Sequence, residues 1–389
     1  MATVESILKK KSKDWDCENL MGGANKPSGS KIPFSSPLMN WATYGGVPRD
    51  KISEFYGEPG GGKTTTCVDI CKNALEIFKM EYEELVDELR TKISHGDKSA
   101  AAKLADLEDV GPKKVLYIDL EHSFDNKWSK TLGIDNADWV MQPPDITAEE
   151  VLQTTLDLIA TGELGLVVLD SIPSLVPSTV LEKKIGERTV AALAGLLTTF
   201  VTKLVPMLTR YGCTFIFINQ VRDNMDNPYV DNTPGGKGIK FYSSLRIRFR
   251  LGKPVDILGN ELPTNAENPD GYKIQATLMK QKSAPWDRKN ATYFLMSQSG
   301  IRPDFDFAQL ALKEGVIQKS GAWFTLCDPS TGAVVVDDSG KPCKLNGLAR
   351  VYDYLNNNAD YYGAIKKYIL DKINGVESDS SPEEIGGLS

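Results

Sequence analysis

The stretch Gly57-Glu58-Pro59-Gly60-Gly61-Gly62-Lys63-Thr64 decides the fold, because it has the form G-x-x-x-x-G-K-T of a phosphate-binding loop. Its four glycines can take positive φ angles and let the backbone approach a ligand closely. Residues 52–56 predict a short strand before the loop, and residues 65–78 predict a helix after it. In this context, backbone N–H groups at the helix N-terminus can hold a triphosphate.

The loop assigns roles to particular side chains. Lys63 is expected to reach the β and γ phosphates of ATP, and Thr64 is expected to hold Mg²⁺ together with Asp170. The further expected nucleotide contacts within the loop are Gly57, Glu58, Pro59, Gly60, Gly61, Gly62 and Thr65. The alternative is a glycine-rich turn that happens to precede a helix.

Length and composition limit the class of protein. The 389 residues suggest two to three domains, and 41% hydrophobic residues suffice for a large core. No apolar run approaches the length that spans a bilayer, and residues 1–11 lack the apolar centre of a signal peptide. Six cysteines and two histidines show no paired or zinc-binding spacing, so we expect buried thiols in a reducing, cytoplasmic compartment.

The charge is unevenly distributed. The net charge of −7 does not by itself suggest nucleic-acid binding. However, residues 76–110 contain ten acidic and five basic residues, and residues 376–389 contain four acidic and none basic. A nearly neutral body with acidic appendages can still have a basic groove.

Composition shifts predict the domain organisation. We expect a helical oligomerisation segment and linker over 1–31, an ATPase core over 32–303, a small C-terminal module over 304–375 and an acidic disordered tail over 376–389. The four lysines between positions 9 and 13 are either a solvated face or a contact to a neighbouring subunit or to DNA. Within the core, residues 80–114 predict an acidic insertion of one or two helices that extend or follow the first helix.

The strand pattern predicts an α/β fold. Apolar runs at 115–119, 166–170 and 215–220 are separated by helical stretches, which is typical of a parallel sheet covered on both faces. Residues 244–251 alternate between apolar residues and arginines, and strands are also expected at 272–280 and 292–297. These three segments predict antiparallel strands added to the parallel core. Helices are expected at 307–314 and 348–374.

Polar residues at the strand ends are the candidate catalytic groups, because ligands bind at the carboxyl ends of parallel strands. Glu121 is a candidate general base, although it could be an ordinary surface carboxylate. Gln220 could contact the γ phosphate. Lys280 and Lys282 could supply positive charge from a neighbouring subunit, or could belong to a solvated strand end.

The aperiodic loop at 221–236 follows Gln220 and is well placed to act as a switch that orders on ATP binding. The basic groups available for a DNA backbone are Arg222, Lys237, Lys240 and the arginines at 246, 248 and 250. The alternative for the arginines is a solvated sheet face.

From about residue 35 to 323, the chain resembles the RecA-type DNA recombinases and, more loosely, their phage-encoded relatives. The resemblance rests on segments 54–65, 117–122, 168–172, 217–222, 235–242 and 321–323 in order and spacing. It implies a RecA-like core, with ATP and Mg²⁺ as cofactors. It also implies single- and double-stranded DNA and copies of the chain itself, but no membrane, as partners. For a phage-encoded chain, the location would be the host cytoplasm.

The resemblance also implies individual roles. Glu121 is similar to the family's catalytic glutamate, Gln220 to its allosteric glutamine, and Lys280 and Lys282 to the lysine pair that reaches the neighbour's ATP. Phe241 is similar to the aromatic residue of the subunit interface. Asp125 and Trp128 match the positions that contact adenine. The implied DNA contacts lie in two loops and are Lys183, Lys184, Val190, Arg222, Met225, Gly235, Gly236 and Lys237.

The sequence departs from the family in its acidic insertion, its two lysines in the first DNA loop, Gly195 in place of a basic residue, and its C-terminal module. The expected function is ATP-dependent DNA strand exchange in a helical filament on single-stranded DNA, with ATP hydrolysed at subunit interfaces. A ring-forming hexameric helicase and a regulatory ATP-binding protein are the alternatives.

Overall fold

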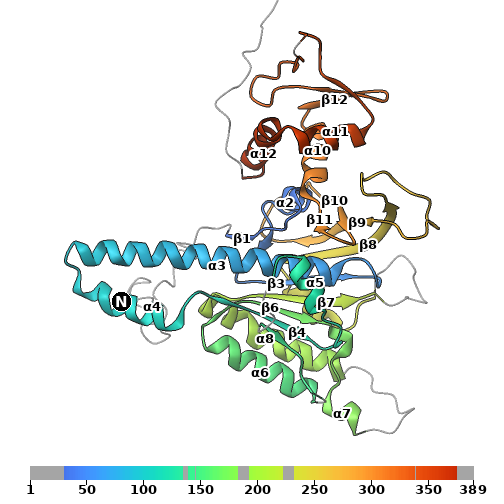
Figure 1. The fold of residues 1–389 in the computed structure, drawn as a ribbon. Helices are drawn as coiled ribbons and strands as arrows, with labels where there is room; N and C mark the ends of the chain where they lie inside the picture. Colours follow the sequence, from blue (N-terminus) through green and yellow to red (C-terminus); the bar gives the residue numbers. More distant parts are fainter. Residues whose placement is uncertain are drawn as a thin grey trace, which may run out of the picture.

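The computed structural model describes residues 30–134, 139–144, 146–182, 192–221, 232–337 and 339–374. Its centre is one sheet with the strand order β11-β10-β9-β8-β3-β7-β6-β4-β5 (Figure 1). The strands are β3 (Ile52–Gly57), β4 (Lys114–Asp119), β5 (Val140–Met141), β6 (Leu164–Asp170), β7 (Thr214–Gln220), β8 (Leu245–Val255), β9 (Gly271–Gln281), β10 (Asn290–Met296) and β11 (Gly300–Ile301).

Strand directions divide this sheet into two parts. The strands from β8 through β3, β7, β6 and β4 to β5 pair in parallel, whereas β8–β9, β9–β10 and β10–β11 pair antiparallel. The expected α/β class with added antiparallel strands is therefore confirmed. One detail of the expectation is wrong: β8 is parallel to β3 and joins the two parts of the sheet.

Helices cover both faces of the parallel strands, so these strands are almost wholly apolar. On one face, α3 (Lys63–Ser94) packs with α2 (Pro37–Thr43) and α5 (Asn126–Thr131). On the other face lie α6 (Ala148–Ala160), α8 (Ala192–Tyr211) and α9 (Gly236–Tyr242) (Figure 1). Successive side chains of β7 point to opposite faces of the sheet. Ile216 therefore packs in the core beneath α3, and Phe217 packs in the core beneath α6 and α8.

The acidic insertion is helical, as expected, but the helix boundary differs. The helix after the loop does not end near Phe78; it continues to Ser94, because no glycine or proline interrupts residues 63–94. After a short turn, α4 (Lys98–Val110) begins with Asp97 as its N-cap and runs back along α3. The two helices project from the core as a hairpin (Figure 1).

The C-terminal residues form α10 (Pro303–Lys313), α11 (Leu348–Asn357), α12 (Ala359–Asn374) and a sheet of β12 (Ile317–Ser320), β13 (Trp323–Leu326) and β14 (Lys344–Asn346). The stretch 348–374 is thus two helices rather than one. Their apolar faces share a core with β10, where Phe294 stacks edge-on against Phe305. The remaining short elements are β1 (Lys31–Ile32), β2 (Val47–Pro48), a 3₁₀ turn (Ile172–Ser174) and α7 (Ser178–Leu181).

Within the described ranges, α8 alone is long and apolar enough to cross a bilayer, with a mean hydropathy of 1.5. The expectation that no run has such a length is therefore wrong. In this fold the buried side of α8, including Leu197, Phe200 and Leu204, packs against β6 and β7.

The close packing of α3 on β6 gives a test of the fold. A Cβ at Gly165 would lie 2.4 Å from the ring of the buried Phe78. Overpacking of this kind costs about 1–3 kcal/mol. We predict that Gly165→Ala lowers the free energy of unfolding by that amount in urea denaturation. Gly195→Ala in α8, where a Cβ meets nothing within 4 Å, is the matched control and should be neutral or stabilise by up to about 1 kcal/mol. Equal effects of the two substitutions would contradict this packing.

Candidate functional site

The glycine loop joins β3 to α3 at the carboxyl edge of the parallel strands. Gly60 has a φ of 74°, and Gly62, the N-cap of α3, has a φ of 79°. Both values lie in the left-handed region that favours glycine. A Cβ on Gly57 would lie 2.0 Å from the carbonyl oxygen of Phe249 in β8. Only glycine therefore fits at position 57, where the loop begins. Unpaired N–H groups of the first turn of α3 are available for an anion.

Lys63 lies inside the loop, where its ammonium donates hydrogen bonds to the carbonyl oxygens of Gly57 (3.1 Å) and Glu58 (2.7 Å). Burial lowers the pKa of Lys63, and the charges of Asp170 and Glu121 oppose that change. The lysine is thus held at the loop by weak neutral partners. A phosphate would give the same ammonium a stronger, charged partner.

Asp170 connects three elements at this edge. Its Oδ2 accepts hydrogen bonds from Thr64 Oγ1 of α3 (2.8 Å) and from the Tyr117 hydroxyl of β4 (2.6 Å). Burial raises the pKa of Asp170 to about 6, although both hydrogen bonds act in the opposite direction. A hydroxyl and a carboxylate side by side are oxygen ligands of the kind that Mg²⁺ prefers.

Glu121 lies just beyond β4 and is exposed. Gln220 Nε2 donates to its Oε1 at 3.2 Å, and the Ser171 hydroxyl donates to the same oxygen. The turn that carries Glu121 is fixed by Asp119, which accepts hydrogen bonds from the backbone N–H of Glu121 (3.2 Å) and Phe124 (2.9 Å). The structure thus brings the candidate base and the candidate γ-phosphate sensor into contact.

A buried polar network behind the loop was not expected from the sequence. Glu54 of β3 is fully buried, forms an ion pair with Arg246 of β8 and accepts a hydrogen bond from Asn219 of β7 at 2.9 Å. The expectation that Arg246 is available for DNA is therefore wrong, because its charge is used within the sheet. A glutamate inside an apolar strand was the signal, since buried carboxylates require a partner.

Lys280 and Lys282 do not join the loop within one chain. In the sheet register, Lys280 pairs with Arg246, and Arg246 pairs with Glu54 near the start of β3. The backbone N–H of Lys282 bonds to Ser244, whose own N–H bonds to Ile52. The glycine loop begins five residues further along β3, about 15 Å away at the rise of a strand. The lysines therefore lie at the opposite edge of the sheet.

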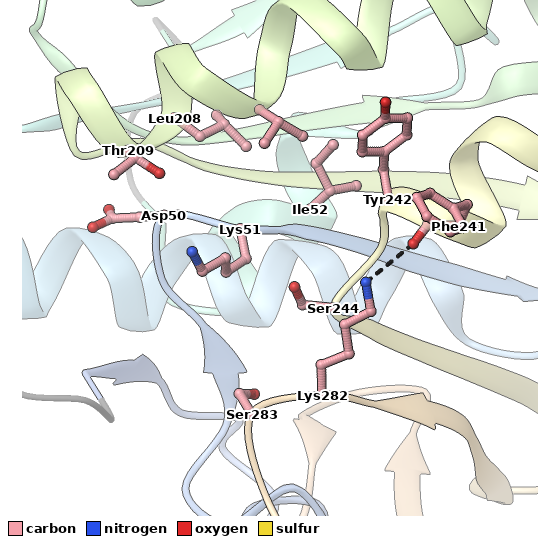
Figure 2. A pocket seen from close by; sticks show the side chains of 11 residues that line it. Asp50, Lys51, Ile52, Leu208, Thr209, Phe241, Tyr242, Ser244, Lys282 and Ser283 are labelled. Carbon is pink, nitrogen blue, oxygen red and sulfur yellow. Dashed lines mark hydrogen bonds between the residues drawn. The ribbon is translucent and has the colours of Figure 1, made fainter. Parts of the chain in front are cut away.

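Phe241 and both lysines form one cluster at the C-terminus of α9, in which Phe241 and Lys282 are exposed. Figure 2 shows Lys282 beside Phe241. Lys280 Nζ donates to the carbonyl oxygens of Lys240 (2.6 Å) and Phe241 (2.7 Å), and Lys282 Nζ donates to that of Phe241 (3.2 Å). Both ammonium groups also lie within 6.0 Å of the Phe241 ring centre. Burial and the neighbouring Lys282 lower the pKa of Lys280 to about 8. Phe241 is 69% exposed.

A cavity of about 380 Å³ adjoins this cluster. It is lined by the start of β3, the C-terminal turns of α8, and Phe241, Tyr242 and Lys282 (Figure 2). The cavity does not contain the glycine loop, Asp170 or Glu121. It therefore lies at the end of the sheet that carries Lys282 and not at the end that carries the glycine loop.

The two expected adenine contacts lie on α5, directly after the Glu121 turn. The Asp125 carboxylate caps this helix by accepting from the N–H groups of Lys127 (2.7 Å) and Trp128 (3.2 Å). Trp128 is half-buried against the α3 core. Both residues thus lie at the same end of the sheet as the glycine loop, and their contact to a base remains a prediction.

Of the expected DNA contacts, Gly235, Gly236 and Lys237 begin α9, where the two glycines have φ angles of 93° and 74° and Lys237 is exposed. A Cβ on Gly236 would lie 2.8 Å from that of Ala194, so α9 starts against the first turn of α8. The expected contacts outside the described residues are Lys183, Lys184, Val190, Arg222 and Met225. Ala194 and Gly236, which follow these two segments in the sequence, lie side by side.

The residues present fit a nucleotide with Mg²⁺. Gly62, with its φ angle in the left-handed region, is the N-cap of α3, and the Lys63 ammonium lies within the loop. Thr64 donates a hydrogen bond to Asp170 at the same end of the sheet. Glu121 and Gln220 lie next to this group through the 3.2 Å contact described above. The edge has an anion site, a cation and an acidic candidate base.

Comparisons with known proteins agree with this arrangement. The family model of the RecA N-terminal domain matches residues 93–302. The chain is 30% identical over 348 residues to Protein RecA of Clostridium perfringens, covering 87% of this chain and 82% of that protein. It is 28% identical over 343 residues to Protein RecA of Thermus aquaticus (87% and 84%) and 29% identical over 347 residues to that of Mycobacterium marinum (88% and 84%).

The raised pKa of Asp170 predicts a pH-dependent stability. The pKa of the Asp170 carboxyl is about 6 in the folded chain and near 3.8 in the unfolded chain. Between these values the folded chain binds the proton more tightly, so the free energy of unfolding falls as pH rises from about 4 to about 6. An asparagine can accept the same hydrogen bonds without ionising. We predict that Asp170→Asn raises the free energy of unfolding by about 1–3 kcal/mol at pH 8 without nucleotide or metal.

The gain from Asp170→Asn should shrink as the pH falls through 6, as measured by urea unfolding at several pH values. Glu84→Gln, on the exposed part of α3, controls for the loss of one negative charge. A gain that does not change with pH would contradict the assignment.

Proposed function

Because the chain belongs to the RecA family, we propose that it is an ATP-dependent DNA strand-exchange protein that assembles as an open helical filament on single-stranded DNA. The observation that carries this proposal is the division of the site between two edges of one sheet. The glycine loop, Asp170 and Glu121 lie at one edge, and Lys280, Lys282 and Phe241 lie at the other. Its expected location is the cytoplasm.

At the nucleotide edge, each side chain has a distinct task. Lys63 and the backbone N–H groups of the loop bind the phosphates, and Thr64 and Asp170 hold the Mg²⁺ that balances their charge. Glu121 takes a proton from the attacking water. Water can reach this carboxylate because Glu121 is exposed. Gln220 currently bonds to Glu121 and would exchange that bond for one to the γ phosphate.

The lysine edge supplies the second half of the site to a neighbouring subunit. The two ammonium groups lie against the exposed ring of Phe241 and donate hydrogen bonds to backbone carbonyls. A phosphate of another chain would give them a stronger, charged partner. The two edges are different surfaces, so their contact is heterologous and repeats from subunit to subunit. A repeat that does not close gives a filament, and one that closes gives the ring of a hexameric helicase.

Coupling to DNA would run through β7 and α9. Gln220 ends β7 directly before the segment 222–231, and the other end of this segment leads into Gly235 and Gly236 beside α8. A shift of Gln220 toward the γ phosphate would therefore act on both segments expected to hold DNA. Lys237, which is exposed, and Arg250 are basic groups of this region that can meet a phosphate backbone.

Turnover and assembly test this function together. We expect ATP hydrolysis to rise when single-stranded DNA is added, and open filaments to appear by negative-stain electron microscopy only with nucleotide and DNA. Lys63→Ala should abolish both. Closed hexameric rings with unwinding activity would favour the helicase. Unchanged hydrolysis and a monomer in all conditions would contradict both proposals.

The shared site predicts complementation between two inactive variants. Lys63→Ala lacks a working loop but retains the lysines, and the double variant Lys280→Ala with Lys282→Ala has the reverse defect. Each should be inactive alone. In an equal mixture, about a quarter of random head-to-tail contacts combine an intact loop with intact lysines, so DNA-stimulated hydrolysis should recover to about that fraction.

Two controls define the mixing experiment. A mixture of Lys63→Ala with Glu121→Gln should not recover DNA-stimulated hydrolysis. Both defects lie in the same half of the site, so intact lysines from a neighbour cannot complete either one. Phosphate release measured over a range of mixing ratios gives the recovery. If the double lysine variant is fully active alone, or if the mixture stays inactive while mixed filaments form, the shared site is wrong.

A further inference from the structure

The buried hydroxyl of Tyr117 has a contact that the roles described above do not use. Tyr117 is in the middle of β4, two residues before Asp119, and is 1% exposed. Its hydroxyl donates to Oδ2 of Asp170, at the end of the neighbouring strand β6, over 2.6 Å. A tyrosine side chain in an apolar strand therefore ends on the carboxylate that we assign to Mg²⁺.

Aromatic packing fixes the direction of this hydroxyl. The Tyr117 ring meets Trp139 edge-on at 5.7 Å and Phe124 at 5.5 Å, and these two rings meet each other edge-on at 5.3 Å. The backbone N–H of Tyr117 also bonds to the carbonyl oxygen of Trp139 at 2.8 Å. Aromatic pairs in these geometries stabilise the fold by more than the burial of their apolar area alone. The hydroxyl is thus held by a rigid group and not by a mobile side chain.

Both hydrogen bonds to Asp170 end on the same oxygen, but they differ in what a metal would do to them. Thr64 Oγ1, at 2.8 Å from Oδ2, is itself expected to bind Mg²⁺ and would leave the carboxylate for the metal. Tyr117 has no such role and lies behind the carboxylate in the core. Its bond can persist in both states, and because the donor is neutral, the carboxylate keeps its charge.

From this geometry we propose that Tyr117 is a positioning residue for the metal site, which holds the Asp170 carboxylate in the orientation that Mg²⁺ requires. The inference deepens the proposed function and depends on it. Partners of metal-binding carboxylates typically change metal affinity by 10- to 100-fold when they are removed. A phenylalanine at this position would keep the aromatic packing and remove only the hydroxyl.

The test measures metal-dependent nucleotide binding and does not rely on hydrolysis. The full-length chain is titrated with a fluorescent, non-hydrolysable ATP analogue at increasing Mg²⁺, and again in excess EDTA. For Tyr117→Phe, we expect the Mg²⁺ midpoint to rise about tenfold, with affinity in EDTA unchanged within about twofold. Mn²⁺ binding to the protein–nucleotide complex, followed by electron paramagnetic resonance, should weaken by a similar factor.

Tyr352→Phe is the matched control, because Tyr352 is also buried, but its hydroxyl lies in the C-terminal core and has no hydrogen-bond partner among the described residues. This variant should keep the wild-type Mg²⁺ midpoint. A Tyr117→Phe midpoint equal to that of the wild type, or a tighter one, would overturn the proposal. Loss of affinity in EDTA as well would also overturn it, because the hydroxyl would then support the loop and not the metal. If the wild-type chain binds no nucleotide, it is the proposed function that fails.

Discussion

Strand direction is the constraint on which the arrangement of this molecule depends. Because β3, β4, β6 and β7 pair in parallel, Gly57 is level with Gln220, and Asp119 is level with Asp170. The residues of one chain that are expected to hold its own nucleotide therefore gather at the carboxyl ends of these strands. The antiparallel return of β9 has the opposite effect, because it carries Lys280 and Lys282 back to the start of β3. A single sheet thus carries two separate groups of candidate functional residues, one at each end of its strands.

This arrangement places charged groups where burial opposes them. Lys63 and Asp170 are almost fully buried. Burial lowers the pKa of Lys63 and raises that of Asp170, so it favours the neutral form of each. Glu54 is compensated inside the sheet by Arg246 and Asn219, whereas the nucleotide edge relies on neutral donors such as Tyr117 and Thr64. Neutral donors hold a carboxylate in place without cancelling the charge that a metal needs. Burial of these two ionisable groups costs free energy, as is common where residues are kept for function.

The sequence predicts this fold well where one local signal is sufficient. The glycine loop, the apolar strands and their polar ends can be identified because each has a strong requirement for residue type, and the α/β class followed from them. The sequence failed where the partner of a residue is distant. Alternation along β8 shows which face Arg246 occupies but not that Glu54 lies on the adjacent strand, so the sequence leaves Arg246 available to DNA or on a solvated sheet face. The sequence indicates only that Tyr117 belongs to an apolar strand, because its contact to Asp170 depends on the pairing of β4 with β6. The sequence leaves open whether the acidic insertion extends the helix after the loop or follows it, since no local signal separates a helix from its own extension.

The structure of the assembled protein tests the two-edge account most directly. Cryo-electron microscopy of the chain with a non-hydrolysable ATP analogue and a single-stranded oligonucleotide would show what surrounds the γ phosphate. The account predicts an open helical assembly in which Lys63 of one subunit and Lys280 and Lys282 of the next approach the same phosphate. Lysines that face solvent in the assembled state, or a nucleotide enclosed by one subunit alone, would contradict it.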